Sequence, residues 1–91
     1  MVLKSTDYCD ILKEARIHSE DIMPAIELIK VKELDREEIR FVYYKENKDG
    51  KINLVPRPLD LEPNVLLKLL ELAFEREIFD DQFKGALKNF L

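Results

Sequence analysis

The stretch from Val65 to Phe74 restricts the fold of this chain more than any other part of the sequence. Eight of its ten residues are apolar, and only Lys68 and Glu71 are polar. A helix on the surface of a small domain has one apolar stripe and a broad polar face, so a helix with this sequence must bury most of its circumference. It therefore lies at the centre of its own domain, or it completes its burial against a second copy of the chain.

The composition is that of a small globular domain. The chain has 91 residues, of which 46% are hydrophobic and 37% are charged. A chain of this length holds one hydrophobic core, so we predict a single compact domain over residues 1–91. No apolar run approaches the roughly 20 residues that cross a bilayer, and the first residues lack the apolar core of a signal peptide. The lone Cys9 excludes an internal disulfide. We expect a cytoplasmic protein that does not associate with membranes.

The first half of the chain mixes helical and strand patterns. Apolar residues recur at helical spacing within residues 5–17, which predicts an amphipathic helix there: Tyr8, Ile11, Leu12 and Ala15. Residues 25–34 fit either a helical stripe or an alternating strand, and their β-branched residues favour the strand slightly. Residues 39–46 and 51–55 are typical of a β-hairpin, because Asn47 to Gly50 reads as a turn with glycine in the left-handed position.

The second half predicts two helices. Pro63 suits the first turn of the apolar helix over residues 64–77, since its missing N–H is not needed there. Asp80 or Asp81 caps a last helix, whose apolar stripe we expect to pack against the domain: Phe83, Leu87, Phe90 and Leu91. The predicted fold is α+β in the order α-β-β-β-α-α. An antiparallel three-stranded meander packs against the helices, or a two-stranded hairpin if residues 25–34 are helical.

Several kinds of chemistry are excluded or weakly supported. One histidine and one cysteine cannot form a zinc site of the usual kind within one chain, and two isolated glycines exclude a phosphate-binding loop. Cys9 is interpreted as a small core residue. Acidic pairs such as Asp80 with Asp81, or Glu75 with Glu77, fit a helix cap and a polar helix face better than an acid–base or metal pair. We therefore predict no metal, no cofactor and no catalytic residues, although a small carboxylate-dependent enzyme stays the least supported hypothesis.

Two surfaces are candidates for binding. One hairpin face combines aromatic rings with cations, as in modules that bind single-stranded nucleic acid: Phe41, Tyr43, Lys45 and Arg57. The alternative is that a helix covers these rings, which the net charge of −4 favours because an acidic chain repels nucleic acid. The second surface is the apolar helix, with four candidate residues for self-association: Leu66, Leu69, Leu70 and Phe74.

The leading hypothesis from these features is a non-catalytic protein-interaction or regulatory module that forms a homodimer through helix 64–77. A different protein partner is also compatible with an apolar surface of this kind. A single-stranded nucleic-acid-binding module that uses the hairpin face is the alternative.

Overall fold

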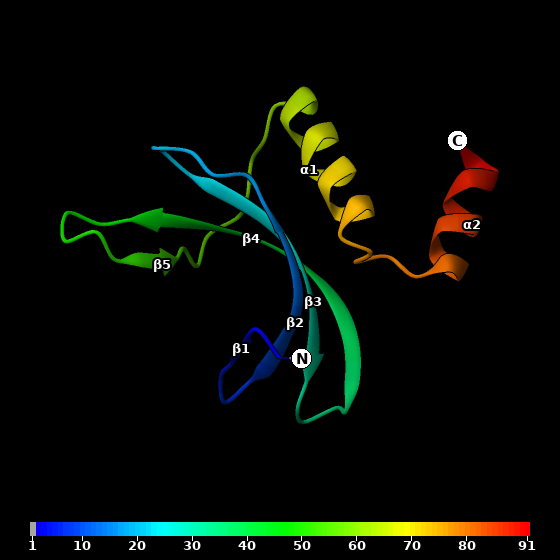
Figure 1. Ribbon diagram of the computed structural model, residues 1–91, viewed down its shortest axis with the longest axis horizontal. Coiled ribbons are helices and arrows are strands. Elements are labelled where there is room, and N and C mark those ends of the chain that lie inside the picture. Colours follow the sequence, from blue (N-terminus) through cyan, green and yellow to red (C-terminus); the bar gives the residue numbers. More distant parts are fainter. Residues whose placement is uncertain (1) are drawn as a thin grey trace.

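The computed structural model describes residues 2–91, and within that range the chain forms one antiparallel sheet and two helices. The strands follow one another in the sheet as in the sequence (Figure 1). Their bounds are β1 Lys4–Ser5, β2 Cys9–Arg16, β3 Met23–Val31, β4 Arg36–Glu46 and β5 Ile52–Leu54, and the helices are α1 Pro63–Glu75 and α2 Asp81–Phe90. The fold is α+β, but its sheet has five strands where the sequence predicted three.

The strands predicted at residues 25–34, 39–46 and 51–55 are present as β3, β4 and β5 of the five-stranded sheet. Residues 25–34, which fit either state, belong mainly to strand β3, and β3 pairs with β4 over its whole length. In the hairpin of β4 and β5, Tyr44 lies opposite Leu54. Its turn is closed by a hydrogen bond from the Asn47 N–H to the Lys51 carbonyl, 2.8 Å. Gly50 adopts a φ of 79°, a backbone conformation that is favourable for glycine and unfavourable for residues with a Cβ atom.

The predicted helix over residues 5–17 is wrong, because this segment forms β1 and β2. The reason is a β-bulge in β2, where the pairing with β3 shifts between Ile11 and Lys13. A bulge inserts one extra residue and reverses which face of the sheet the following side chains point to. Ile11 and Ala15 are both buried, yet on opposite faces. An alternating strand interrupted in this way imitates the spacing of a helix.

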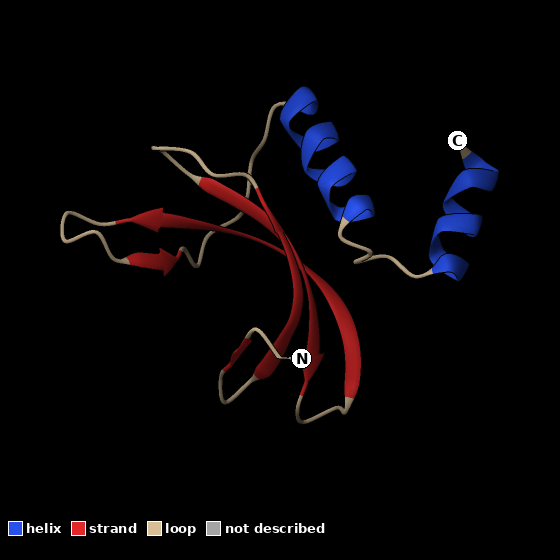
Figure 2. Ribbon diagram, viewed as in Figure 1, coloured by secondary structure: helices blue, strands red, loops and turns tan. Residues whose placement is uncertain are grey.

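The two faces of the sheet have different surroundings. The outer face carries Ala15 and Ile26, which form a buried cluster with Leu69 and Ala73 of α1 and with Ile78 and Phe79 after it. The inner face carries the alternate residues of β3, and the edge strands β1 and β5 bend toward that side, away from the helices (Figure 2). Within the described chain, α1 contacts β2 and β3 but not β4. The outer face of β4 is therefore left uncovered by α1.

The helices begin where the sequence predicted and are less buried than expected. Pro63 occupies the start of α1, and the Asp80 carboxylate caps α2 by accepting the Phe83 N–H at 2.8 Å. Only Leu69 and Ala73 of α1 are buried, so the prediction that most of this helix is covered is wrong for the single chain. The prediction that the last helix packs against the domain is also wrong, since none of the residues of α2, all of them described, is buried.

Candidate functional site

The candidate hairpin surface lies on the outer face of the sheet, the same side as α1. Phe41 is opposite Ile26 and Tyr43 is opposite Pro24, so both rings point toward the helix layer. Phe41 is nevertheless 57% exposed, whereas Tyr43 is half-buried. Lys45 and Arg57 are exposed. Of the two rings that the sequence left open between core and surface, Phe41 is thus on the surface and Tyr43 is partly covered.

The four candidate residues for self-association differ in how far their own chain covers them. Leu69 is fully buried in the core. Phe74 is half-buried and packs edge-on against Phe79 with ring centroids 5.1 Å apart. Leu66 is 42% exposed and Leu70 is half-buried. Leu66 is therefore the most accessible of the four to a second molecule.

The structure brings these two candidate surfaces together. An open groove of about 600 Å³ runs between β4 and α1, and it is lined by residues from both surfaces and from the connection between them: Phe41, Leu59, Asp60, Leu61, Leu66, Leu69 and Leu70. All but Asp60 are apolar. The groove exists because α1 packs on β2 and β3 and leaves β4 uncovered. We call it the β4–α1 groove and regard it as the candidate interaction site.

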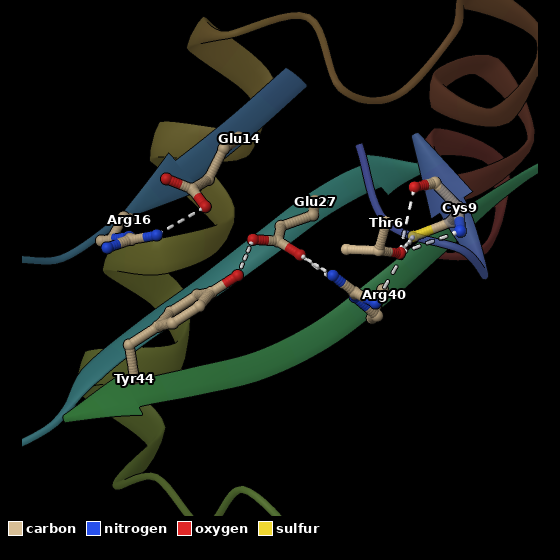
Figure 3. Close-up of polar contacts among 7 residues, drawn as sticks. All are labelled: Thr6, Cys9, Glu14, Arg16, Glu27, Arg40 and Tyr44. Carbon is tan, nitrogen blue, oxygen red and sulfur yellow. Dashed lines mark hydrogen bonds and ion pairs between the residues drawn. The ribbon is translucent and has the colours of Figure 1, made fainter. Parts of the chain in front are cut away.

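A second notable place is a polar cluster on the inner face, centred on Glu27 of β3 (Figure 3). The side chain of Glu27 has no solvent exposure. One carboxylate oxygen accepts two hydrogen bonds from Arg40, 2.8 Å from Nη2 and 3.1 Å from Nε, and the other accepts the Tyr44 hydroxyl at 2.5 Å. Both donors come from β4. A buried carboxylate needs such partners, because burying an unpaired charge is very unfavourable.

Two residues of β2 extend this cluster. Arg16 donates from Nη2 to Glu14 at 2.8 Å, and its guanidinium carbon lies 4.0 Å from the centre of the Tyr44 ring in a cation–π contact. The Arg16 Nε is buried and has no hydrogen-bond partner among the described residues. Glu14 and Arg16 reach the inner face only because the bulge in β2 reverses the alternation before them.

The pKa values in the cluster shift in different directions. Burial raises the pKa of Glu27 above its ordinary 4.5, the neighbouring Glu14 raises it further, and the donors Tyr44 and Arg40 oppose both effects. Burial opposes ionisation of Glu14 as well, but its contacts with Glu27 and Arg16 lower its pKa overall. Burial, followed by Glu27, also raises the pKa of Tyr44. The Tyr44 phenol therefore stays protonated and donates to the carboxylate.

The geometry favours a structural role for this cluster. A cavity of about 300 Å³ adjoins it and is lined by Glu14, Arg16 and Tyr44, together with residues of β1, β2 and β5, but Glu27 does not line it. The carboxyl with the raised pKa is thus sealed from any molecule in the cavity. Cys9 also belongs to the buried part of the cluster, because its fully buried Sγ accepts a hydrogen bond from Arg40 Nη1 at 3.7 Å. The cluster therefore ties β2, β3 and β4 together, with Glu27 on its buried side and Glu14, Arg16 and Tyr44 at the cavity.

The acidic pairs considered from the sequence are not part of this cluster. Asp80 serves as a helix cap, while Asp81, Glu75 and Glu77 are exposed. The carboxyls that do come together, Glu14 and Glu27, were missed. The available signal was Glu27 itself, a single acid within the apolar run from Met23 to Ile29. A charge in such a strand has to find partners on neighbouring strands.

Three comparisons were made with known proteins. No protein-family model, curated protein or solved structure matches the chain. Among residues 2–91 no group of three or more His, Cys, Asp or Glu side chains is arranged to hold a metal ion. Neither helix of the described chain has the length and apolar character to cross a membrane. The functional proposal therefore depends on the geometry of the β4–α1 groove and its surroundings.

Replacing Glu27 by alanine tests the structural role of the cluster. The change leaves Arg40 without its carboxylate and Tyr44 without its acceptor, and breaking a buried pair in this way costs about 3–5 kcal/mol of unfolding free energy. The matched control is Glu38→Ala on β4, which removes a more exposed pair with Arg36 at 2.7 Å and should cost at most about 1 kcal/mol. Urea unfolding of both variants measures the difference, and equal losses would contradict the role assigned to Glu27.

The raised pKa of Glu27 predicts a pH dependence of stability with a definite sign. The folded chain holds this proton more tightly than the unfolded chain, so the stabilisation is complete below the unfolded value of 4.5 and declines as the pH rises through 4.5 toward the folded value. The glutamine of a Glu27→Gln variant does not titrate, so this variant lacks the pH dependence that Glu27 contributes. The stability of the wild type should therefore fall relative to that of Glu27→Gln as the pH rises above 4.5, in thermal unfolding at a series of pH values. Parallel curves would show that the pKa of Glu27 is not raised.

Proposed function

We propose that this protein is a non-catalytic interaction module that self-associates as a homodimer, with the β4–α1 groove at the interface. The observation that carries the proposal is the amount of surface that a single chain exposes. A folded monomer of 10.8 kDa is expected to expose about 5,500 Å², whereas this chain exposes 7060 Å². The excess is about 1,500 Å², and a standard interface covers only about 800 Å² on each partner.

The dimensions of the chain point the same way. Its radius of gyration is 14.0 Å, compared with about 12 Å for a compact domain of this length. The extra surface is also apolar at the groove, where Phe41 is 57% and Leu66 is 42% exposed. An exposed apolar patch of this kind is typical of a protein–protein contact.

Pairing through a sheet edge is a less favourable way to form the dimer. β5 pairs only with Tyr44–Glu46 of β4, so the earlier part of the β4 edge is open to another strand. Four of the five residues from Arg36 to Arg40 are charged, however, and charged side chains on an open edge disfavour pairing with another chain. The apolar groove is therefore the better candidate for the interface.

A second candidate function is binding of single-stranded nucleic acid by the hairpin face. One observation favours it, namely that the Phe41 ring is open on the same face of β4 as the exposed Lys45. Two observations weigh against it. The net charge of the chain is −4, and the space beside Phe41 is an apolar groove whose only charged lining residue, among those described, is the acidic Asp60.

Substitutions in the groove test self-association. Leu66→Glu should weaken the dimer by about 2 kcal/mol or more, because it places a charge at the centre of an apolar contact. The control is Leu34→Glu in the turn between β3 and β4, where the leucine is similarly exposed but does not line the groove. Sedimentation equilibrium of the wild type and both variants gives the masses. A wild type that stays monomeric at high concentration ends the proposal, as does a Leu66→Glu variant that dimerises like the control.

The nucleic-acid alternative predicts a different result. Binding to a short labelled single strand should fall steeply with salt, and a Lys45→Ala, Arg57→Ala double variant should reduce the salt dependence by about two charges. Both substitutions lie outside the apolar groove and should leave the dimer intact. Fluorescence anisotropy at several salt concentrations measures this, and the absence of salt-dependent binding by the wild type excludes this function.

A further inference from the structure

Helix α2 is an amphipathic helix without a covered face. No Cα atom of α2 lies within 8 Å of another helix or strand in the described part of the chain. Its apolar residues share one side at helical spacing, namely Phe83, Leu87 and Phe90, and Leu91 follows them. Phe90 is 76% exposed. Only the first turn touches the domain, through the Phe83 ring 5.0 Å from that of Phe79.

A helix of this length is not stable by itself. Isolated helices shorter than about 12 to 15 residues are marginal in water, and α2 has ten. The sequence nevertheless encodes a helix, with Asp80 as a cap at its start and Lys88 in its last turn. A capped helix with an apolar stripe indicates that something covers the stripe.

The chain cannot readily cover this stripe with its own groove. The connection from α1 to α2 is fixed, because Ile78 and Phe79 are buried in the core and Lys13 Nζ donates to the Glu77 carbonyl at 3.0 Å. α2 therefore starts from the C-terminal end of α1. The groove is lined by Leu66, Leu69 and Leu70 of α1 and by the connection that leads into this helix. In Figure 1, α1 lies between that connection and α2.

We propose that in the homodimer each chain inserts the apolar stripe of its α2 into the β4–α1 groove of its partner. This inference rests on the proposed self-association and specifies that α2 of the second chain occupies the groove. Apolar anchors at positions i, i+4 and i+7 are the usual way in which a helix fills a groove. Charge is complementary at the rim, since Asp60 lines the groove and Lys84, which pairs with the fully exposed Asp81 of its own helix at 3.6 Å, flanks the stripe. A reciprocal exchange also closes the dimer with two-fold symmetry, so no surface is left to propagate a fibre.

The surface area agrees with this arrangement. Two copies of the contact form in each dimer, and every chain contributes both a helix and a groove to them. Each chain therefore covers more surface than a one-patch contact would, which fits the excess of about 1,500 Å² better than the standard 800 Å² per partner does. Contact with the groove alone would leave Phe90 and Leu91 exposed.

Disulfide trapping between two differently substituted chains tests the exchange. Leu66→Cys chains are mixed with Leu87→Cys chains and oxidised, and the native Cys9 does not compete because it is fully buried. We expect a reducible dimer in which positions 66 and 87 are linked, identified by mass spectrometry of the joined peptides. The matched control mixes Leu66→Cys with Asn89→Cys, because position 89 lies on the opposite side of α2, and it should give little of this product.

A second measurement does not depend on cross-linking. Leu87→Glu should weaken the dimer about tenfold or more in sedimentation equilibrium, the effect of losing about 1.4 kcal/mol at an interface, while Asn89→Glu should leave it unchanged. Both chains should fold, since neither side chain is buried in the single chain. A dimer that is dissociated by Leu66→Glu but insensitive to Leu87→Glu, or trapped equally at positions 87 and 89, overturns the exchange and keeps the proposed function. A wild type that is monomeric overturns both.

Discussion

The carboxylate of Glu27 is the constraint on which the sheet depends. It is fully buried at the middle of β3, where an ionisable group is tolerated only if donors surround it. Arg40 lies directly opposite Glu27 in the pairing of β3 with β4, and Tyr44 reaches the second carboxylate oxygen from the same strand. A slip of one residue would send both donors to the other face of the sheet. The hydrogen bonds of Glu27 can therefore form only in the observed register of β3 and β4.

The bulge in β2 allows a single strand to serve both faces. Before the bulge, Cys9 and Ile11 point to the inner face, where they form a small apolar cluster with Ile29 and Val31. After it, Ala15 faces α1, and Arg16 points inward against the Tyr44 ring. One inserted residue thus supplies an alanine small enough for close packing of α1 and an arginine for the polar cluster.

The outer face of the sheet accounts for much of the apolar surface that the chain exposes. α1 covers β2 and β3, and β4 is left with Phe41 exposed beside Leu66. α2 carries a further apolar stripe that is covered only in part, where Phe83 packs against Phe79. The inner face gives the chain a defined sheet, whereas on the outer side Phe41 of β4 and Phe90 of α2 stay largely exposed in the single chain. The proposed role in self-association follows from this difference between the two faces.

Several elements could be predicted from the sequence because their signals are local. The turn from Asn47 to Gly50 sets the register of β4 and β5, Pro63 marks the start of α1, and Asp80 caps α2. These signals lie within a few residues of the structure that they specify, so no distant contact is needed to interpret them. The apolar character of Val65 to Phe74 likewise indicated a helix, although it left open whether the helix is covered by its own domain or by a second copy.

Other features were decided only by tertiary structure. The strand at Cys9–Arg16 was not predictable, because a bulge that depends on pairing with β3 imitated helical spacing. The partners of Glu27 lie 13 and 17 residues away in the sequence, and the β4–α1 groove joins residues from two elements. Local patterns determine which segments can be helices or turns. The position of each face depends on strand register and on where α1 packs, and both are set by contacts between residues far apart in the chain.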